Sequence, residues 1–244
     1  MAEGLFSRLV AASAEPWCAY TGHDFVMQLA NGELPEASFR RYLTQDYLFL
    51  IHFARAWGLA ICKSDTLAEM RRAQRLVAAI LDVEIGLHID YCRGWDLSEA
   101  AMVSEPEAMA TIAYTRFVLD RGLAGDRLDL ETALAPCIVG YAVIAQERMA
   151  NPMTRFDGNP YREWLEMYAG AEYQDLAREA EAALDEQFVR RGGEGRFRSL
   201  VASFATAARL EADFWQMGLD GAGCPSPQPS PRMRGEGGTR VAGG

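Results

Sequence analysis

Carboxylate side chains interrupt apolar helix faces at three places in the sequence. At about 100° per residue, Asp46 falls in the stripe of Phe39, Leu43, Leu50 and Trp57, Glu211 in that of Leu200, Phe204, Ala208 and Trp215, and Glu84 with His88 in that of Val77, Leu81 and Tyr91. Burying a carboxylate is costly unless it is paired, hydrogen-bonded or protonated. Each one alone is most simply a satisfied core group, but one polar cavity would satisfy all three together. In such a cavity, Glu211 is expected to have a raised pKa.

A cysteine follows a proline within the apolar stretch "TALAPCIVGYAVI", residues 132–144. On a helix, Cys137 shares one face with Tyr141, so thiol and phenol point the same way. Pro136 removes a backbone hydrogen bond and predicts a bend at this point. A lone core cysteine is usually inert packing, whereas a thiol beside carboxyl groups is a candidate nucleophile.

Aromatic residues could wall a pocket for a flat ring, although each alone is more typical of a core. They are Phe49, Tyr114, Tyr141, Tyr168 and Tyr173. Cys18, Cys62 and Cys92 have no charged pattern near them and are interpreted as packing.

Helical periodicity covers almost every segment that would position these residues, which predicts an all-α bundle. Thr66 and Glu69 have the spacing of a capping box and predict a helix to about residue 91. Ser104 and Glu107 repeat that spacing and predict a helix that ends near Gly122. Further helices are expected over about 35–57, 129–149 and 196–218, with two more that meet near Gly170.

The composition fits one helical domain over residues 1–220, followed by a disordered tail rich in Pro, Gly, Ser and Arg over 221–244. A net charge of −10 without a basic stripe argues against nucleic acid as a partner. No apolar run of transmembrane length and no signal peptide is expected. Five scattered cysteines without a CxxC pair fit reduced thiols in the cytoplasm.

Five short motifs lie in the order and spacing of one known family. They are "QDYLFLIHFAR", "YT" at Tyr114, "PCIVGY", "EWLEMY" and "LEADFW", and the opening "GHDFVMQLANGELPEASFRRYL" is also similar. The chain resembles the TenA family (thiaminase II, aminopyrimidine aminohydrolase) over roughly residues 5–218. The resemblance implies a haem-oxygenase-like helical fold, a homotetramer and no metal or other cofactor.

The resemblance also implies a reaction of thiamine salvage. The substrate would be 4-amino-5-aminomethyl-2-methylpyrimidine, converted to the hydroxymethyl pyrimidine and ammonia, or thiamine itself. By position, Cys137 resembles the nucleophile, Glu211 the acid/base and Asp46 the carboxylate that holds the pyrimidine. Phe49, Tyr114, Tyr141 and Tyr168 resemble the surrounding aromatic residues, and Glu84 is a further candidate for binding substrate.

Two other functions are compatible with the residues. Asp46, Glu84, His88 and Glu211 could ligate iron in a metal-dependent oxidase, although the four-residue step from Glu84 to His88 differs from the ExxH of many di-iron bundles. A haem oxygenase is disfavoured because His23 stands at an expected helix start, where it would cap. The third alternative is a protein that binds a pyrimidine without turnover.

Overall fold

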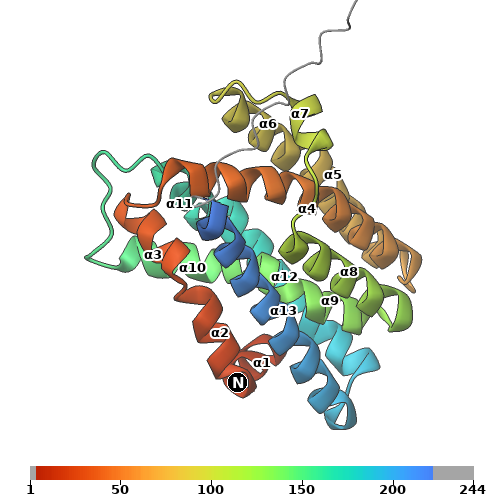
Figure 1. Ribbon diagram of the computed structural model, residues 1–244. Helices are drawn as coiled ribbons and strands as arrows, with labels where there is room; N and C mark the ends of the chain where they lie inside the picture. Colours follow the sequence, from red (N-terminus) through yellow and green to blue (C-terminus); the bar gives the residue numbers. More distant parts are fainter. Residues whose placement is uncertain (1–3, 222–244) are drawn as a thin grey trace, which may run out of the picture.

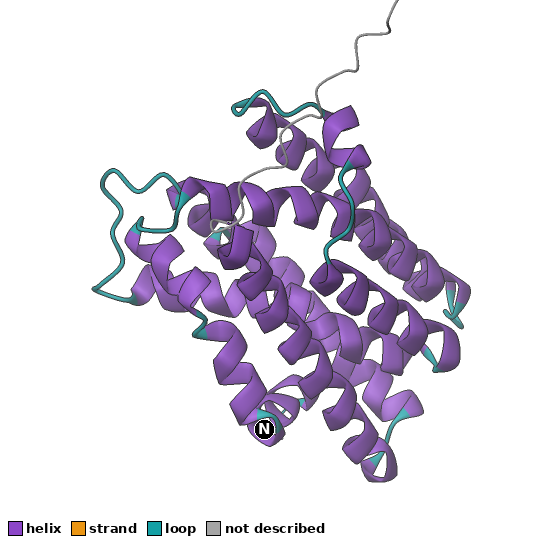
Figure 2. Cartoon of the chain, in the orientation of Figure 1, coloured by secondary structure: helices purple, strands orange, loops and turns teal. Residues whose placement is uncertain are grey.

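The computed structural model describes residues 4–221, and the regular secondary structure in that range is all helical, with no strand in it. The helices are α1 (Leu5–Ala12), α2 (Ala14–Thr21), α3 (Asp24–Asn31), α4 (Glu36–Cys62), α5 (Leu67–Ala78), η1 (Ala79–Glu84), α6 (Ile85–Arg93), α7 (Glu99–Ser104), α8 (Met109–Ala124), α9 (Arg127–Ala135), η2 (Pro136–Gly140), α10 (Tyr141–Ala150), α11 (Arg162–Ala169), α12 (Ala171–Arg191) and α13 (Glu194–Asp220). Figure 2 shows that short loops join most of them, with a longer loop between α10 and α11. The predicted tail lies outside the described residues, apart from Gly221.

Two long helices form the centre of the bundle. Helix α13 packs against α2, α4, α8 and α9, and α4 packs against α5, α6 and α8 (Figure 1). The apolar stripe predicted around Asp46 is buried against these neighbours, because Phe39, Leu43, Leu50 and Trp57 all lie in the core. The two stripes that carry Asp46 and Glu211 therefore meet inside the molecule.

Local sequence explains several helix ends. Thr66 and Glu69 form the predicted capping box, in which each side chain accepts a hydrogen bond from the other's backbone N–H. His23 caps α3, since its Nδ1 accepts a hydrogen bond from the N–H of Phe25 at 3.2 Å. Gly170 separates α11 from α12 as predicted.

The predicted capping box of Ser104 and Glu107 is wrong. Ser104 ends α7, and α8 begins at Met109 after an extended segment. Gln45 of α4 holds this segment, since its Nε2 donates to the carbonyl of Pro106 and its Oε1 accepts from the N–H of Ala108. A side chain of α4, and not a local capping motif, thus holds the segment that precedes α8.

Two short π-helices interrupt otherwise α-helical runs. η1 lies between α5 and α6, and η2 begins at Pro136, where the sequence predicted a bend. Proline has no N–H to continue the α-helical pattern. Tyrosine hydroxyls satisfy carbonyls of η2: Tyr20 donates to Pro136 at 3.2 Å, and Tyr173 donates to Ile138 at 3.2 Å.

The run Arg127–Ala150, which comprises α9, η2 and α10, is long and apolar enough to cross a membrane by length and composition. The expectation that no run reaches that length is therefore wrong. Because 89% of the run's most apolar window is buried inside the bundle, we interpret this run as a core helix.

Candidate active site

Cys137 lines a small pocket of about 50 Å³ that also contains predicted site residues from four other elements. These are Asp46 and Phe49 of α4, Glu84 of η1, Tyr141 of α10 and Tyr168 of α11. Tyr173 of α12 lines it too. The structure therefore brings together six of the eight site residues predicted from the sequence, although they span residues 46 to 168.

The remaining two predicted residues, Tyr114 and Glu211, form a buried pair next to this pocket. The hydroxyl of Tyr114 donates a 2.8 Å hydrogen bond to Oε1 of Glu211. The ring of Tyr114 packs against that of the pocket residue Phe49, with 5.1 Å between centroids. Glu211 is 1% exposed. Burial raises its pKa to about 8, opposed by the hydrogen bond from Tyr114 and reinforced by the charge of Asp46.

The thiol of Cys137 is held in its neutral form. Its Sγ lies 3.0 Å from the carbonyl oxygen of Leu134, to which the S–H donates. Burial raises the pKa of Cys137 well above its usual value, the negative charge of Glu211 raises it further, and the hydroxyl of Tyr114 opposes these effects. A nucleophilic role for this thiol therefore requires a base that takes its proton during the reaction.

Asp46 is fixed by an ion pair with His88, a contact that the sequence did not predict. His88 Nε2 lies 2.8 Å from Asp46 Oδ2, and its Nδ1 lies 2.9 Å from the backbone carbonyl of Glu84. Both partners can only accept, so both ring nitrogens must donate and the imidazole carries a positive charge. Burial lowers the pKa of His88, but the hydrogen bond and charge of Asp46 outweigh it and raise that pKa overall.

The orientation of Asp46 leaves one of its oxygens for a ligand. The hydroxyl of Tyr42 also donates to Oδ2, at 3.3 Å, so both hydrogen bonds that residues 4–221 make with this carboxylate end on the same oxygen. Asp46 lines the pocket, and Oδ1 takes part in neither of these hydrogen bonds. The Glu84 carboxyl adds a second acid, whose pKa burial raises to about 7.

Aromatic rings form the walls of the pocket. Centroids lie 5.0 Å apart for Tyr141 and Tyr168, and 4.7 Å apart for Tyr168 and Tyr173. Apolar residues complete the lining, and no sequence pattern had distinguished them from core: Leu50, Phe53, Leu76, Ala79, Ile80, Ile138 and Leu176. A flat, polar-edged ring is the shape that such walls accommodate.

The metal-oxidase alternative has no support in the geometry. Over the part of the chain that the structure describes, no group of three or more His, Cys, Asp or Glu side chains is arranged to hold a metal ion. His88 is instead occupied on both nitrogens, by Asp46 and by the carbonyl of Glu84.

The fold and the site together define a class of protein. It consists of all-helical bundles with a pocket that is lined by a thiol, carboxyl groups and aromatic rings. A profile of the TENA/THI-4/PQQC family matches residues 11–221, and the chain belongs to this family. The resemblance and the all-α TenA-type fold expected from the sequence are thereby confirmed.

Individual relatives cover nearly the whole helical part of the chain. An uncharacterized protein of Haemophilus influenzae is 39% identical over 216 residues, 88% of this chain and 99% of that protein. The aminopyrimidine aminohydrolase of Halalkalibacterium halodurans is 32% identical over 213 residues, 87% of this chain and 94% of that enzyme. A solved structure described as a TenA family transcription regulator from Silicibacter sp. superposes with a TM-score of 0.83 at 42% identity, covering 88% of this chain and 96% of that one.

Proposed function

We propose that this protein is an aminopyrimidine aminohydrolase of thiamine metabolism. It converts 4-amino-5-aminomethyl-2-methylpyrimidine to the hydroxymethyl pyrimidine and ammonia, and thiamine is a further candidate substrate. One observation carries the proposal: Cys137 and Asp46 line the same pocket, between the aromatic walls of Phe49, Tyr141 and Tyr168. The name of the relative in Halalkalibacterium halodurans supports the same reaction.

Substrate binding follows from the pocket chemistry. Asp46 accepts hydrogen bonds from the amino group and a protonated ring nitrogen, and a carboxylate suits this paired donor edge. The 2.8 Å contact with the imidazolium of His88 fixes the orientation of the Asp46 carboxylate. The aromatic rings stack on the pyrimidine and exclude water.

Catalysis begins with addition of the Cys137 sulfur to an electron-poor ring carbon. Glu211 gives its proton to a ring nitrogen and takes the proton that the thiol releases. Its carboxyl group therefore ends the step protonated, as it began. The protonated amine on the methylene carbon then leaves as ammonia, and water adds to that carbon. Release of the thiol restores the aromatic ring, which gives the hydroxymethyl product.

The test is ammonia release from the aminomethyl pyrimidine by the purified full chain. The parent protein should turn over, and Cys137→Ser should lower kcat/KM by about 10³-fold or more because serine is a much weaker nucleophile. Cys62→Ser is the matched control and should retain activity, because Cys62 is exposed. The interpretation of Cys18 and Cys62 as packing residues is therefore wrong, whereas Cys92 is buried. An active Cys137→Ser protein would overturn the nucleophile, and binding without turnover by the parent would favour a pure binding protein.

The resemblance also leads us to propose a cytoplasmic homotetramer without a cofactor. These properties stay predictions. Size-exclusion chromatography with light scattering tests the tetramer directly.

A further inference from the structure

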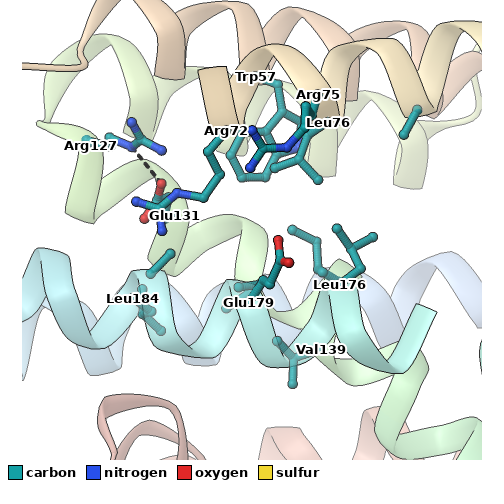
Figure 3. Close-up of a pocket in the computed structure, with 15 residues that line it drawn as sticks. Trp57, Arg72, Arg75, Leu76, Arg127, Glu131, Val139, Leu176, Glu179 and Leu184 are labelled. Atoms are coloured by element: carbon teal, nitrogen blue, oxygen red, sulfur yellow. Dashed lines mark hydrogen bonds and ion pairs between the residues drawn. The ribbon is translucent and has the colours of Figure 1, made fainter. Parts of the chain in front are cut away.

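The π-helical segment η2, which carries Cys137, borders two cavities. Cys137 and Ile138 line the candidate active-site pocket. Ile138 and Val139 line a larger cavity of about 190 Å³ between α5, α9 and α12, and Figure 3 shows this cavity with Val139 among its lining residues. Close packing normally fixes buried backbone, and a segment that borders two cavities has fewer packed neighbours. Other contacts must therefore hold the backbone that carries the thiol.

Two tyrosine hydroxyls supply such contacts, one on each side of Cys137 in the sequence. Tyr20 of α2 donates to the carbonyl of Pro136 at 3.2 Å, and Tyr173 of α12 donates to the carbonyl of Ile138 at 3.2 Å. Within residues 4–221, four tyrosine hydroxyls donate to backbone carbonyls, and two of the four reach this five-residue segment. These bonds are therefore concentrated where the thiol is attached.

Aromatic packing fixes both rings that carry these hydroxyls. Tyr20 is 0% exposed, and its ring stacks on that of Trp215 with 6.2 Å between centroids. The same ring lies so close to η2 that a Cβ on Gly140 would come within 2.5 Å of its Cε1. Tyr173 packs edge-on against Tyr168, with 4.7 Å between centroids. Each hydroxyl therefore donates from a fixed position.

These hydrogen bonds restrict where the thiol can lie. The carbonyl of Pro136 shares a rigid peptide plane with the Cα of Cys137, so the bond from Tyr20 fixes that plane. The bond from Tyr173 fixes a second plane, on the C-terminal side of the cysteine. The 3.0 Å contact from Sγ to the carbonyl of Leu134 then sets the side-chain torsion of the cysteine.

We propose that Tyr20 and Tyr173 are positioning residues for Cys137, because their hydroxyl groups hold η2 so that the thiol points at the reacting ring carbon. This inference rests on the proposed hydrolase reaction, in which the sulfur adds to that carbon. Both hydroxyls act through the backbone of η2 and transfer no proton. Burial raises the pKa of each tyrosine well above its usual value, so both hydroxyls remain donors near neutral pH.

The variants Tyr20→Phe and Tyr173→Phe keep the rings and remove only the hydroxyls. Displacing a reacting group by about 1 Å can lower its rate about 10²-fold. Each variant should therefore lower kcat for ammonia release at least about tenfold, and should change KM less than about threefold because the pocket walls are kept. Tyr91→Phe is the matched control, since the hydroxyl of Tyr91 donates to the carbonyl of Pro160 at 3.1 Å, and it should keep the parent kcat.

Alkylation of Cys137 by iodoacetamide, followed by peptide mass spectrometry of the full chain, gives a readout that does not depend on turnover. A loosened segment opens more often, so both variants should be alkylated at least about threefold faster than the parent, and Tyr91→Phe should not. A thiol that reacts faster with the reagent while turnover falls is the expected result of lost positioning. Tyr173 is partly exposed, so its variant tests the proposal independently of the deeply buried Tyr20.

An unchanged kcat or an unchanged alkylation rate in both tyrosine variants would overturn the proposal. A general loss of packing would also overturn it, and its mark is that Tyr91→Phe loses as much kcat as the other two variants. Faster alkylation in both variants of a parent that releases no ammonia would contradict the hydrolase reaction, and would still support the role of the two hydroxyls in holding the thiol.

Discussion

At the scale of single residues, the candidate site is defined by where its protons lie. His88 carries a positive charge between Asp46 and the carbonyl of Glu84. Cys137 is a neutral thiol, and burial raises the pKa values of Glu84 and Glu211 to about 7 and about 8. Near neutral pH, the site therefore holds both a carboxyl proton and a thiol proton for the proposed chemistry.

Glu211→Gln should make the folded protein less sensitive to alkaline pH. The pKa of Glu211 is about 8 in the folded chain, above the usual value of 4.5, so the folded state binds the extra proton. Its contribution to the free energy of unfolding is complete below pH 4.5 and is lost as pH rises through 8. Glutamine mimics the protonated carboxyl and accepts from Tyr114, so the variant should match the parent at pH 5 and exceed it at pH 9.

Urea unfolding of parent and variant at pH 5, 7 and 9 measures this difference. Glu84 is present in both proteins, so its titration cancels in the comparison. Parallel pH dependence in the two proteins would contradict the raised pKa of Glu211.

Residue patterns predicted the members of the site better than their contacts. A carboxylate in an apolar stripe marked Asp46 and Glu211 because burying one is too costly without a shared polar environment. The Asp46–His88 pair was missed because it joins residues on different helices, 42 positions apart. Only tertiary packing decides which polar group meets which.

At the scale of secondary structure, two of the segments that contribute to the candidate site are π-helical. Glu84 ends η1 and Cys137 lies in η2. A π-turn inserts one extra residue into a helix and is frequent at functional sites. Pro136 indicated an irregularity at η2. The hydrogen bonds from Tyr20 of α2 and Tyr173 of α12 to its carbonyls were not predictable, because they join distant segments.

Gly140→Ala should destabilise the fold through its effect on η2. A Cβ at this position would lie 2.5 Å from Cε1 and 2.8 Å from the hydroxyl oxygen of the buried Tyr20. Relieving that overlap moves the residue that bonds to Pro136, so we expect a loss of about 1–3 kcal/mol in unfolding free energy. Denaturant unfolding measures it.

Gly58→Ala is the matched control, because a Cβ there meets nothing within 4 Å. Within helix α4, alanine should raise stability by about 0.5–1 kcal/mol. Equal effects of the two substitutions would show that η2 tolerates displacement of Tyr20.

At the scale of the whole molecule, Glu69 connects three helices. It caps α5, its Oε1 accepts from Gln187 of α12 at 2.9 Å and from Arg190, and its Oε2 lies 3.9 Å from Nη1 of Arg127 on α9. The capping role was predictable from local spacing with Thr66. The links to α9 and α12 were not, since they follow from the packing of distant segments.

Glu69→Gln should therefore destabilise the bundle as a whole. Burial alone would raise the pKa of Glu69, but hydrogen bonds from Gln187 and from the backbone of Asp65 and Thr66 lower it to about 2. The stabilisation is present above pH 4.5 and lost as pH falls towards 2. We expect the variant to lose about 2–4 kcal/mol at pH 7.

The loss should shrink as urea unfolding is repeated at lower pH. Glu166→Gln is the control, since Glu166 forms an exposed pair with Arg162 at 2.6 Å and should matter by less than about 0.5 kcal/mol. Equal losses for the two variants would show that Glu69 acts only as another surface charge.

The pocket draws on side chains from α4, η1, η2 and α11, with Glu211 of α13 behind them. Assembly of the site thus depends on the final described helix, which is also the last of these to be synthesised. During translation, the segments that carry Asp46 and Cys137 are made before α13. The core around them is therefore incomplete until α13 has been synthesised. Any shortened product that ends before α13 lacks both Glu211 and a helix that packs against α2, α4, α8 and α9.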